Sequence, residues 1–314
     1  MNLAHAHLLL NHVPTVGFAI GVSLLVIAVV YRDDRLQKLS LGLMFLIAVA
    51  TVPVYLTGVA AGELIQDRPE VSMPLIRGHE DAALSAFVVM QITGGAAWLA
   101  LWQIRRFSRA PRWTVLTVLL LSVVSMGLMA YAANLGGAIR HPEIAAVEEP
   151  ALARAPLAAA WLRSQTVMSV VNDTSWVWPA GEVAHCLGLG LSFGVVLLLN
   201  LRVLGMMRSL SFAEVHRMLP WGMVGFAMNL ATGMMFFIAV PAQYTSNQPF
   251  HWKIVLLVAL GVNLLYFTSD NDTWKLGRDE RASPLTRAMA ASTIVLWLGV
   301  VYFGRMLPFL GNSY

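Results

Sequence analysis

The sequence predicts an all-α polytopic membrane protein with about eight transmembrane helices, arranged as two four-helix bundles. Of its 314 residues, 58% are hydrophobic and only 12% are charged, whereas soluble domains carry about 25% charged residues. The mean hydropathy is +0.67. Apolar runs of the roughly 20 residues that cross a bilayer recur along the chain, at residues 13–31, 39–65, 81–104, 113–135, 179–201, 220–240, 252–267 and 286–307.

The charges of the loops predict how these runs are oriented in the membrane. About two thirds of the 21 lysines and arginines lie in the loops that follow the odd-numbered runs. Loops rich in Lys and Arg stay on the cytoplasmic side, so we expect both termini on the outer side. The net charge of +4 is explained by these basic loops and does not indicate a nucleic-acid partner. The predicted partner of the apolar runs is the lipid bilayer. The single cysteine, Cys186, excludes an intrachain disulfide and any multi-cysteine metal centre.

A longer outer segment divides the chain into three parts. We expect residues 1–141 to form the first bundle, 142–175 a periplasmic interfacial segment, and 176–314 the second bundle. Within the middle part, the Ala-rich residues 151–171 include Arg154, Trp161 and Arg163. This mixture is too polar to span the bilayer and is typical of a helix lying in the interface. A plain linker is the alternative.

The histidines are unevenly distributed. On the predicted topology all eight except His216 fall on the outer half of the protein. Neutral imidazole is a good axial ligand for haem iron. The skew therefore predicts haem b, in two copies, held between helices near the outer surface.

The positions of four histidines predict how they pair. His12 and His79 open the first and third runs, and His185 and His251 lie at the start of the fifth and seventh. Ligands in helix bundles come from facing helices, so we expect one iron between His12 and His79 and another between His185 and His251. His7 points about 140° away from His12 on a regular helix and is the reserve ligand. The alternative is that these are hydrated interfacial histidines.

Three charged residues have predicted supporting roles. Glu182 shares a helix face with His185 three residues later and would orient its ring, as carboxylates commonly do for metal-bound histidine. Arg77 and Lys253 would face haem propionates, although snorkelling to the interface is an ordinary alternative. Small residues such as Gly58 and Gly94-Gly95 allow close helix approach.

Each half also resembles a known family. His7-x-x-x-x-His12-Val13-Pro14, Thr57-Gly58, His79 and Gly136-Gly137 resemble an uncharacterised family of four-helix bacterial membrane domains, which opens with His-Pro-x-x-x-His-Phe-Pro. The second half resembles the copper-resistance protein D-like family and related four-helix domains. That resemblance rests on Ala184-His185 with Gly188 and Gly190, on Asn200-Leu201-Arg202-Val203-Leu204-Gly205, on Leu219-Pro220-Trp221 with Gly233, and on Phe250-His251-Trp252-Lys253. These resemblances imply the bacterial inner membrane.

Three functions follow from these features. The first is a di-haem b-type, cytochrome-like subunit that transfers electrons near the periplasmic face, with a periplasmic c-type cytochrome or the subunits of a redox complex as partners. The second is copper transport or handling, which needs soft ligands along a path. The third is a cofactor-free anchor subunit. The sequence contains no Ser/His/Asp arrangement, phosphate-binding loop or nicotinamide fingerprint, so a stand-alone enzyme is disfavoured.

Overall fold

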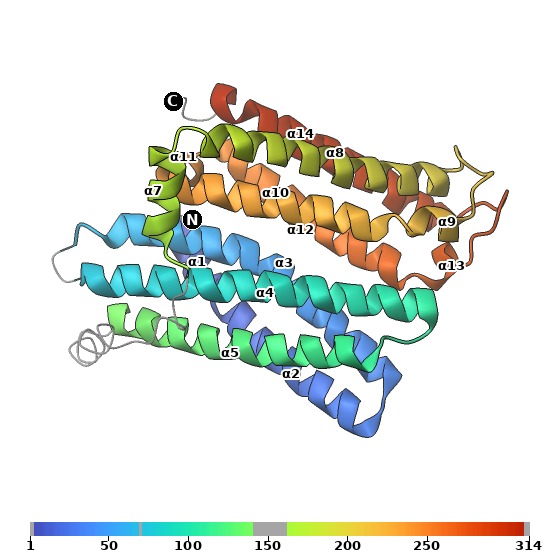
Figure 1. Cartoon of the computed structure of the whole chain (residues 1–314), viewed down its shortest axis with the longest axis horizontal. Helices are drawn as coiled ribbons and strands as arrows, with labels where there is room; N and C mark the ends of the chain where they lie inside the picture. The colour runs from blue at the N-terminus through green and yellow to red at the C-terminus, as the bar shows by residue number, and fades with distance from the viewer. Residues whose placement is uncertain (1–2, 69–70, 141–161, 311–314) are drawn as a thin grey trace. The chain divides into compact units, whose positions relative to one another are not determined.

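The computed structural model describes residues 3–68, 71–140 and 162–310. These residues form helices and no strand. Eight helical segments among them are long and apolar enough to cross a membrane, which confirms the prediction of an all-α multi-pass membrane protein. The chain divides into two compact units, Met1–Thr166 and Val167–Tyr314 (Figure 1). Unit 1 and unit 2 are described separately below.

Unit 1 contains α1 (Leu3–Leu10), α2 (His12–Tyr31), α3 (Asp34–Ile65), α4 (Met73–Phe107) and α5 (Arg112–Arg140). Helices α1 and α2 together form the first span. They are separated by a turn at Asn11. Pro14 explains the break, because proline has no N–H to donate to the carbonyl of Leu10.

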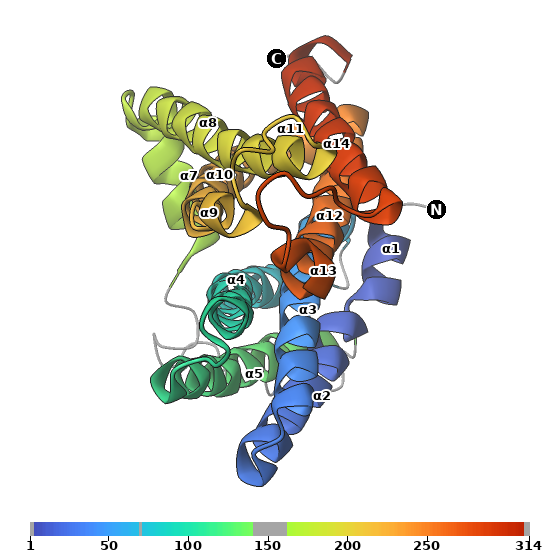
Figure 2. The same cartoon turned by 90° about the vertical axis from the view of Figure 1, so that its right-hand side faces the viewer.

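Four helices of unit 1 close into a bundle. Helix α3 packs against α2 and α4, and α5 packs against α4 and α2, while α1 lies against α3 (Figure 2). The contact between α3 and α4 is tightest at Gly94, where an added Cβ would lie 2.3 Å from the Cβ of Ala48. The neighbouring Gly95 has no such contact among the described residues. Only Gly94 is therefore required for close approach.

Unit 2 contains the end of α7 (Ser164–Asp173), followed by α8 (Val177–Leu204), α9 (Phe212–His216), α10 (Leu219–Ala239), α11 (Pro241–Thr245), α12 (Gln248–Ser269), α13 (Asn271–Trp274) and α14 (Pro284–Leu310). Helix α8 packs against α10 and α14, and α14 packs against α12. Helices α8 and α10 approach most closely at Gly188 and Gly225. An added Cβ at either glycine would lie 2.8 Å or less from the other's carbonyl oxygen.

A buried arginine organises two connections of unit 2. Arg202 is fully buried near the end of α8. Its guanidinium donates to the carbonyl oxygens of Leu210, Gly277 and Glu280. These acceptors lie in the two connections that follow α8 and α13, so one side chain fixes both.

Several helices begin earlier than hydropathy predicts. Helix α4 begins at Met73, eight residues before the predicted run, because a hydropathy window stops at polar residues such as His79, Glu80 and Asp81. His79 therefore lies within a helix. His7 likewise belongs to α1, which precedes the first predicted run.

Only part of the predicted interfacial segment can be described. Residues 141–161, including His141, Arg154 and Trp161, lie outside the described residues. Helix α7 begins at Ser164, whose backbone N–H and hydroxyl donate to the Asp81 carboxylate at 2.9 and 3.0 Å. The carboxylate thus caps the start of α7, a favourable position for a negative charge. The interfacial location of this segment stays a prediction.

Candidate haem-ligand site

His7 faces inward from α1 onto α3. Its Nδ1 lies 3.1 Å from the carbonyl oxygen of Val54. A carbonyl oxygen can only accept, so Nδ1 carries the proton and Nε2 presents a lone pair. The ring lies over Gly58, one helical turn further along α3, where an added Cβ would come within 2.9 Å of the ring carbon Cε1.

His79 repeats this arrangement between α4 and α5. Its Nδ1 lies 2.8 Å from the carbonyl oxygen of Ala132, so its Nε2 also presents a lone pair. The ring lies over Gly136, where an added Cβ would be 3.1 Å from Cε1. In both cases the carbonyl belongs to residue i and the glycine to residue i+4 of the neighbouring helix.

The glycines explain why these carbonyls are accessible. In a helix the Cα–Cβ bond points toward the N-terminus, so the side chain at i+4 lies beside the carbonyl of residue i. Without a side chain at position 58 or 136, an imidazole can reach the carbonyl and form a second hydrogen bond to it. The spacing Val54/Gly58 and Ala132/Gly136 therefore builds two cradles of the same kind.

The two rings come from the first and third spans of the same unit. Both side chains are half-buried, and no hydrogen bond to either Nε2 is described. Unit 1 thus contains two imidazoles that are each oriented through Nδ1 and each have Nε2 available.

His7, and not His12, shares the ring orientation of His79. The His12 side chain is exposed at the start of α2. His7 lies in α1 and His12 opens α2, on opposite sides of the break at Asn11, and only His7 faces inward. The reserve ligand of the sequence analysis is therefore the one whose position fits the site.

Carboxylates lie on the other side of α4. Glu80 packs over Gly62 of α3, where an added Cβ would be 3.0 Å from Oε1. Its charge interacts with those of Asp81, Glu63 and Arg77. Arg77 itself is exposed, so its predicted contact with a propionate stays a prediction. Among the described residues, no group of three or more His, Cys, Asp or Glu side chains is arranged to hold a metal ion.

In unit 2 the best-oriented histidine is His185 on α8. Its Nδ1 lies 2.8 Å from the hydroxyl oxygen of Thr232 on α10. The Thr232 hydroxyl donates its one proton to the carbonyl of Met228 at 2.7 Å, so it accepts from His185 Nδ1–H. Thr232 performs the role predicted for Glu182, which is exposed and instead accepts from Trp178 Nε1 at 3.2 Å.

His251 is oriented differently from the other three. Its Nε2 lies 2.8 Å from the carbonyl oxygen of Thr245, at the end of α11. This bond leaves Nδ1 as the only nitrogen with a lone pair. No contact between His251 and His185 is described, and the charge that acts on His185 is that of Lys253. The predicted pairing of His185 with His251 stays a prediction.

Two further histidine and cysteine positions have ordinary explanations. His216 is 1% exposed, and its ring centroid lies 3.6 Å from that of Trp274. Cys186 is exposed. Neither residue contributes to the histidine sites.

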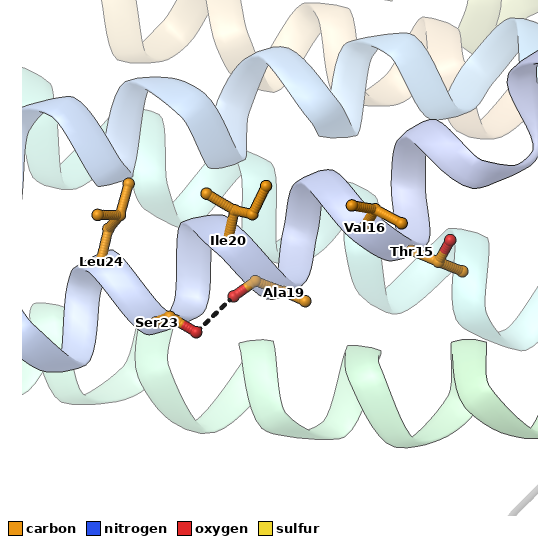
Figure 3. A pocket seen from close by; sticks show the side chains of 6 residues that line it. All are labelled: Thr15, Val16, Ala19, Ile20, Ser23 and Leu24. Carbon is orange, nitrogen blue, oxygen red and sulfur yellow. Dashed lines mark hydrogen bonds between the residues drawn. The ribbon is translucent and has the colours of Figure 1, made fainter.

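A shallow apolar hollow lies along α2 and away from these sites. Figure 3 shows its six lining residues, Thr15, Val16, Ala19, Ile20, Ser23 and Leu24. The Ser23 hydroxyl is used within the helix, since it donates to the Ala19 carbonyl at 2.8 Å (Figure 3). None of these side chains is titratable, so the hollow adds no chemistry.

Comparison of the chain with models of protein families, with curated proteins and with solved structures gives no match. The two family resemblances stay predictions. Functional inference therefore rests on the geometry above.

Proposed function

We propose that this protein is a membrane-embedded electron-transfer protein that binds haem b in unit 1, with His7 and His79 as the axial ligands. One observation carries the proposal: each imidazole donates Nδ1–H to a backbone carbonyl and presents Nε2. Metal-bound histidine almost always donates its other ring nitrogen in this way, which fixes the tautomer and ring orientation.

The donor set fits haem better than a bare metal ion. A porphyrin supplies four nitrogen ligands, so iron needs only the two axial imidazoles that unit 1 offers. A structural zinc site needs about four protein ligands, and copper handling needs soft ligands. The described residues contain no cluster of that size, and the one cysteine points outward.

The chain's own residues would position and tune the site. Bound haem supplies one-electron chemistry at its iron. Val54 and Ala132 hold the imidazole protons on Nδ1, which keeps each Nε2 deprotonated. Gly58 and Gly136 allow the rings to reach those carbonyls. A half-buried, mostly apolar surrounding limits water, one of the levers that set a redox potential.

Placement in a membrane gives this chemistry a cellular role. We propose the bacterial inner membrane with both termini outside, and therefore a site near the periplasmic face. A c-type cytochrome or a subunit of a redox complex is the proposed partner. An anchoring role within that complex is compatible with electron transfer.

Absorption spectra of the purified protein in detergent, oxidised and reduced, test the proposal. We expect a b-type α-band and loss of that band in His7→Ala and His79→Ala. His12→Ala is the matched control and should keep the wild-type spectrum. A colourless protein, or equal loss in all three variants, would contradict the assignment; metal analysis of the same samples reports any bound copper.

A further inference from the structure

The connection between α4 and α5 in unit 1 concentrates positive charge. Four arginines lie within eight residues of the chain: Arg105, Arg106, Arg109 and Arg112. Together they are termed the arginine hairpin. Arg105 and Arg106 belong to the last turn of α4, and Arg112 is the first residue of α5. Because α4 and α5 pack against each other, the short turn between them keeps the four cations at one end of the helix pair.

The arginine hairpin lacks counter-charges. Residues 82–140 contain no aspartate and no glutamate. Within residues 3–68, 71–140 and 162–310, no ion pair is described for Arg106, Arg109 or Arg112. Arg109 and Arg112 are also exposed. The hairpin is therefore a positively charged surface that the described chain does not neutralise.

Other basic connections of the protein contain acidic residues. The connection from α2 to α3 has Asp33 and Asp34 among its arginines, and Arg278, after α13, pairs with Glu214 at 2.9 Å. The positive-inside rule depends on lysine and arginine and is nearly indifferent to acidic residues. Membrane topology therefore accounts for the arginines of the hairpin but not for its lack of carboxylates.

The start of α5 is an unfavourable place for a cation. A helix N-terminus carries a partial positive charge and favours an anion, yet α5 begins with Arg112 and has no acidic residue in its first turn. At the start of α3, by contrast, the Asp33 carboxylate accepts from the backbone N–H groups of Arg35 and Leu36 at 2.8 and 3.0 Å. An anion from outside the chain would stabilise α5 as Asp33 stabilises α3.

Exposed aromatic side chains flank the arginine hairpin. Phe107 is 62% exposed at the end of α4, and Trp113 is 64% exposed at the start of α5. Both helices are long and apolar enough to cross a membrane. Tryptophan is enriched at the level of the lipid head groups, which is also the level of the lipid phosphates. The surroundings of the hairpin therefore favour a lipid over a soluble polyanion.

We infer that the arginine hairpin binds the phosphate groups of anionic phospholipids. A guanidinium presents a planar fork of N–H donors that matches two phosphate oxygens, and such charge-assisted pairs are stronger than neutral hydrogen bonds. A zwitterionic lipid carries the same phosphate but adds an ammonium group, which four cations repel. About 40 Å of α4 separates Arg105 from His79, so this inference goes beyond the haem site and does not depend on it.

The test is native mass spectrometry of the purified full-length protein in a neutral detergent, titrated with phosphatidylglycerol or with phosphatidylcholine of the same acyl chains. We expect saturable binding of phosphatidylglycerol, at least tenfold tighter than that of phosphatidylcholine. Arg109→Gln/Arg112→Gln removes charge-assisted bonds and should weaken phosphatidylglycerol binding at least tenfold. Arg109→Lys/Arg112→Lys keeps the charge but not the fork and should have an intermediate affinity.

Arg32→Gln/Arg35→Gln is the matched control, because it removes the same charge from exposed arginines of the same unit and should bind phosphatidylglycerol as wild type does. Equal affinity for the two lipids, equal losses in the two glutamine variants, or displacement of the lipid by an equal concentration of inorganic phosphate would overturn the inference.

Circular dichroism identifies any variant that does not fold. If the glutamine variant of the hairpin does not fold, the lysine variant and the comparison of the two lipids decide. The absorption spectrum of each folded hairpin variant should match that of wild type, so a failure of the haem proposal and a failure of this inference are seen in different measurements.

Discussion

Unit 1 and unit 2 both place histidines from alternate spans at one end of a helical bundle, yet they orient them differently. In unit 1, His7 and His79 bond to backbone carbonyls. In unit 2, His185 bonds to a threonine hydroxyl. A backbone carbonyl cannot rotate away, whereas a side chain can. Histidines at similar positions in sequence are thus held by the backbone in unit 1 and, at His185, by a side chain in unit 2.

The largest expected effect is on haem content, which should differ between variants of unit 1 and variants of unit 2. The double variant His7→Ala/His79→Ala should lose all bound haem, because both axial ligands of unit 1 are removed. His185→Ala/His251→Ala should keep the wild-type amount. Haem per chain, measured as the pyridine haemochrome, checks both. Two haems in wild type and one in each double variant would instead support the second haem predicted from sequence.

The next effect concerns stability at the buried arginine, a feature of unit 2. Arg202→Gln should lower the free energy of unfolding by about 3 kcal/mol or more, since buried carbonyls left without a donor cost about 1–3 kcal/mol each. Arg278→Gln is the control, because Arg278 bonds to Glu214 at the surface and exposed pairs contribute less than about 1 kcal/mol. Denaturation in detergent measures both; equal losses would rule out the organising role of Arg202.

Close helix contacts should matter equally in the two units. Gly94→Ala in unit 1 and Gly225→Ala in unit 2 introduce a Cβ within 2.3 and 2.7 Å of other atoms. Such overpacking costs about 1–3 kcal/mol. Gly95→Ala and Gly190→Ala are the matched controls, because no described atom lies within 4 Å of the added Cβ. Thermal unfolding that fails to separate the two sets would argue against this packing.

Smaller effects, on haem affinity, are expected at the glycines that lie beneath the histidine rings. Gly58→Ala or Gly136→Ala forces His7 or His79 away from its carbonyl. Loss of such a supporting bond typically weakens metal binding about 10–100-fold, and haem titration of the apoprotein measures this affinity. Gly137→Ala should have no effect. Gly233→Ala, the corresponding change in unit 2, should not displace His185, because 3.7 Å between the added Cβ and its Cε1 is an ordinary contact.

The smallest effect is a pH dependence at the start of α3. The backbone N–H groups of Leu36 and Arg35 bond to the Asp33 carboxylate and lower its pKa. A lowered folded-state pKa means that the stabilisation is present above the unfolded pKa and is lost as pH falls through the folded pKa. The difference in melting temperature between wild type and Asp33→Ala should therefore shrink under acid conditions.

Unit 2 supplies the control for this prediction. Asn247 caps α12 by accepting from the Phe250 N–H at 3.3 Å, and an amide does not titrate. Asn247→Ala should cost about 1 kcal/mol at every pH at which the protein folds. A pH-independent effect of Asp33→Ala would contradict the assignment of its pKa.

The fold class followed from the sequence because apolar length and low charge admit few alternatives. The histidines were also recognisable, since His12, His79, His185 and His251 lie near the starts of predicted spans. Glycine carries two meanings that the sequence does not separate. Gly94 serves close helix packing, whereas Gly58 and Gly136 open a carbonyl to an imidazole, and only the neighbouring helix decides between them.

The sequence by itself determined a multi-pass helical membrane protein, because span length and polarity are properties of consecutive residues. The tertiary structure alone decided that His7 and not His12 faces inward, that the carbonyls of Val54 and Ala132 orient His7 and His79, and that Thr232 orients His185. Those choices depend on how a break at Asn11 turns one ring inward and on which helix packs next to which. Such contacts join residues dozens of positions apart, and no local pattern encodes them.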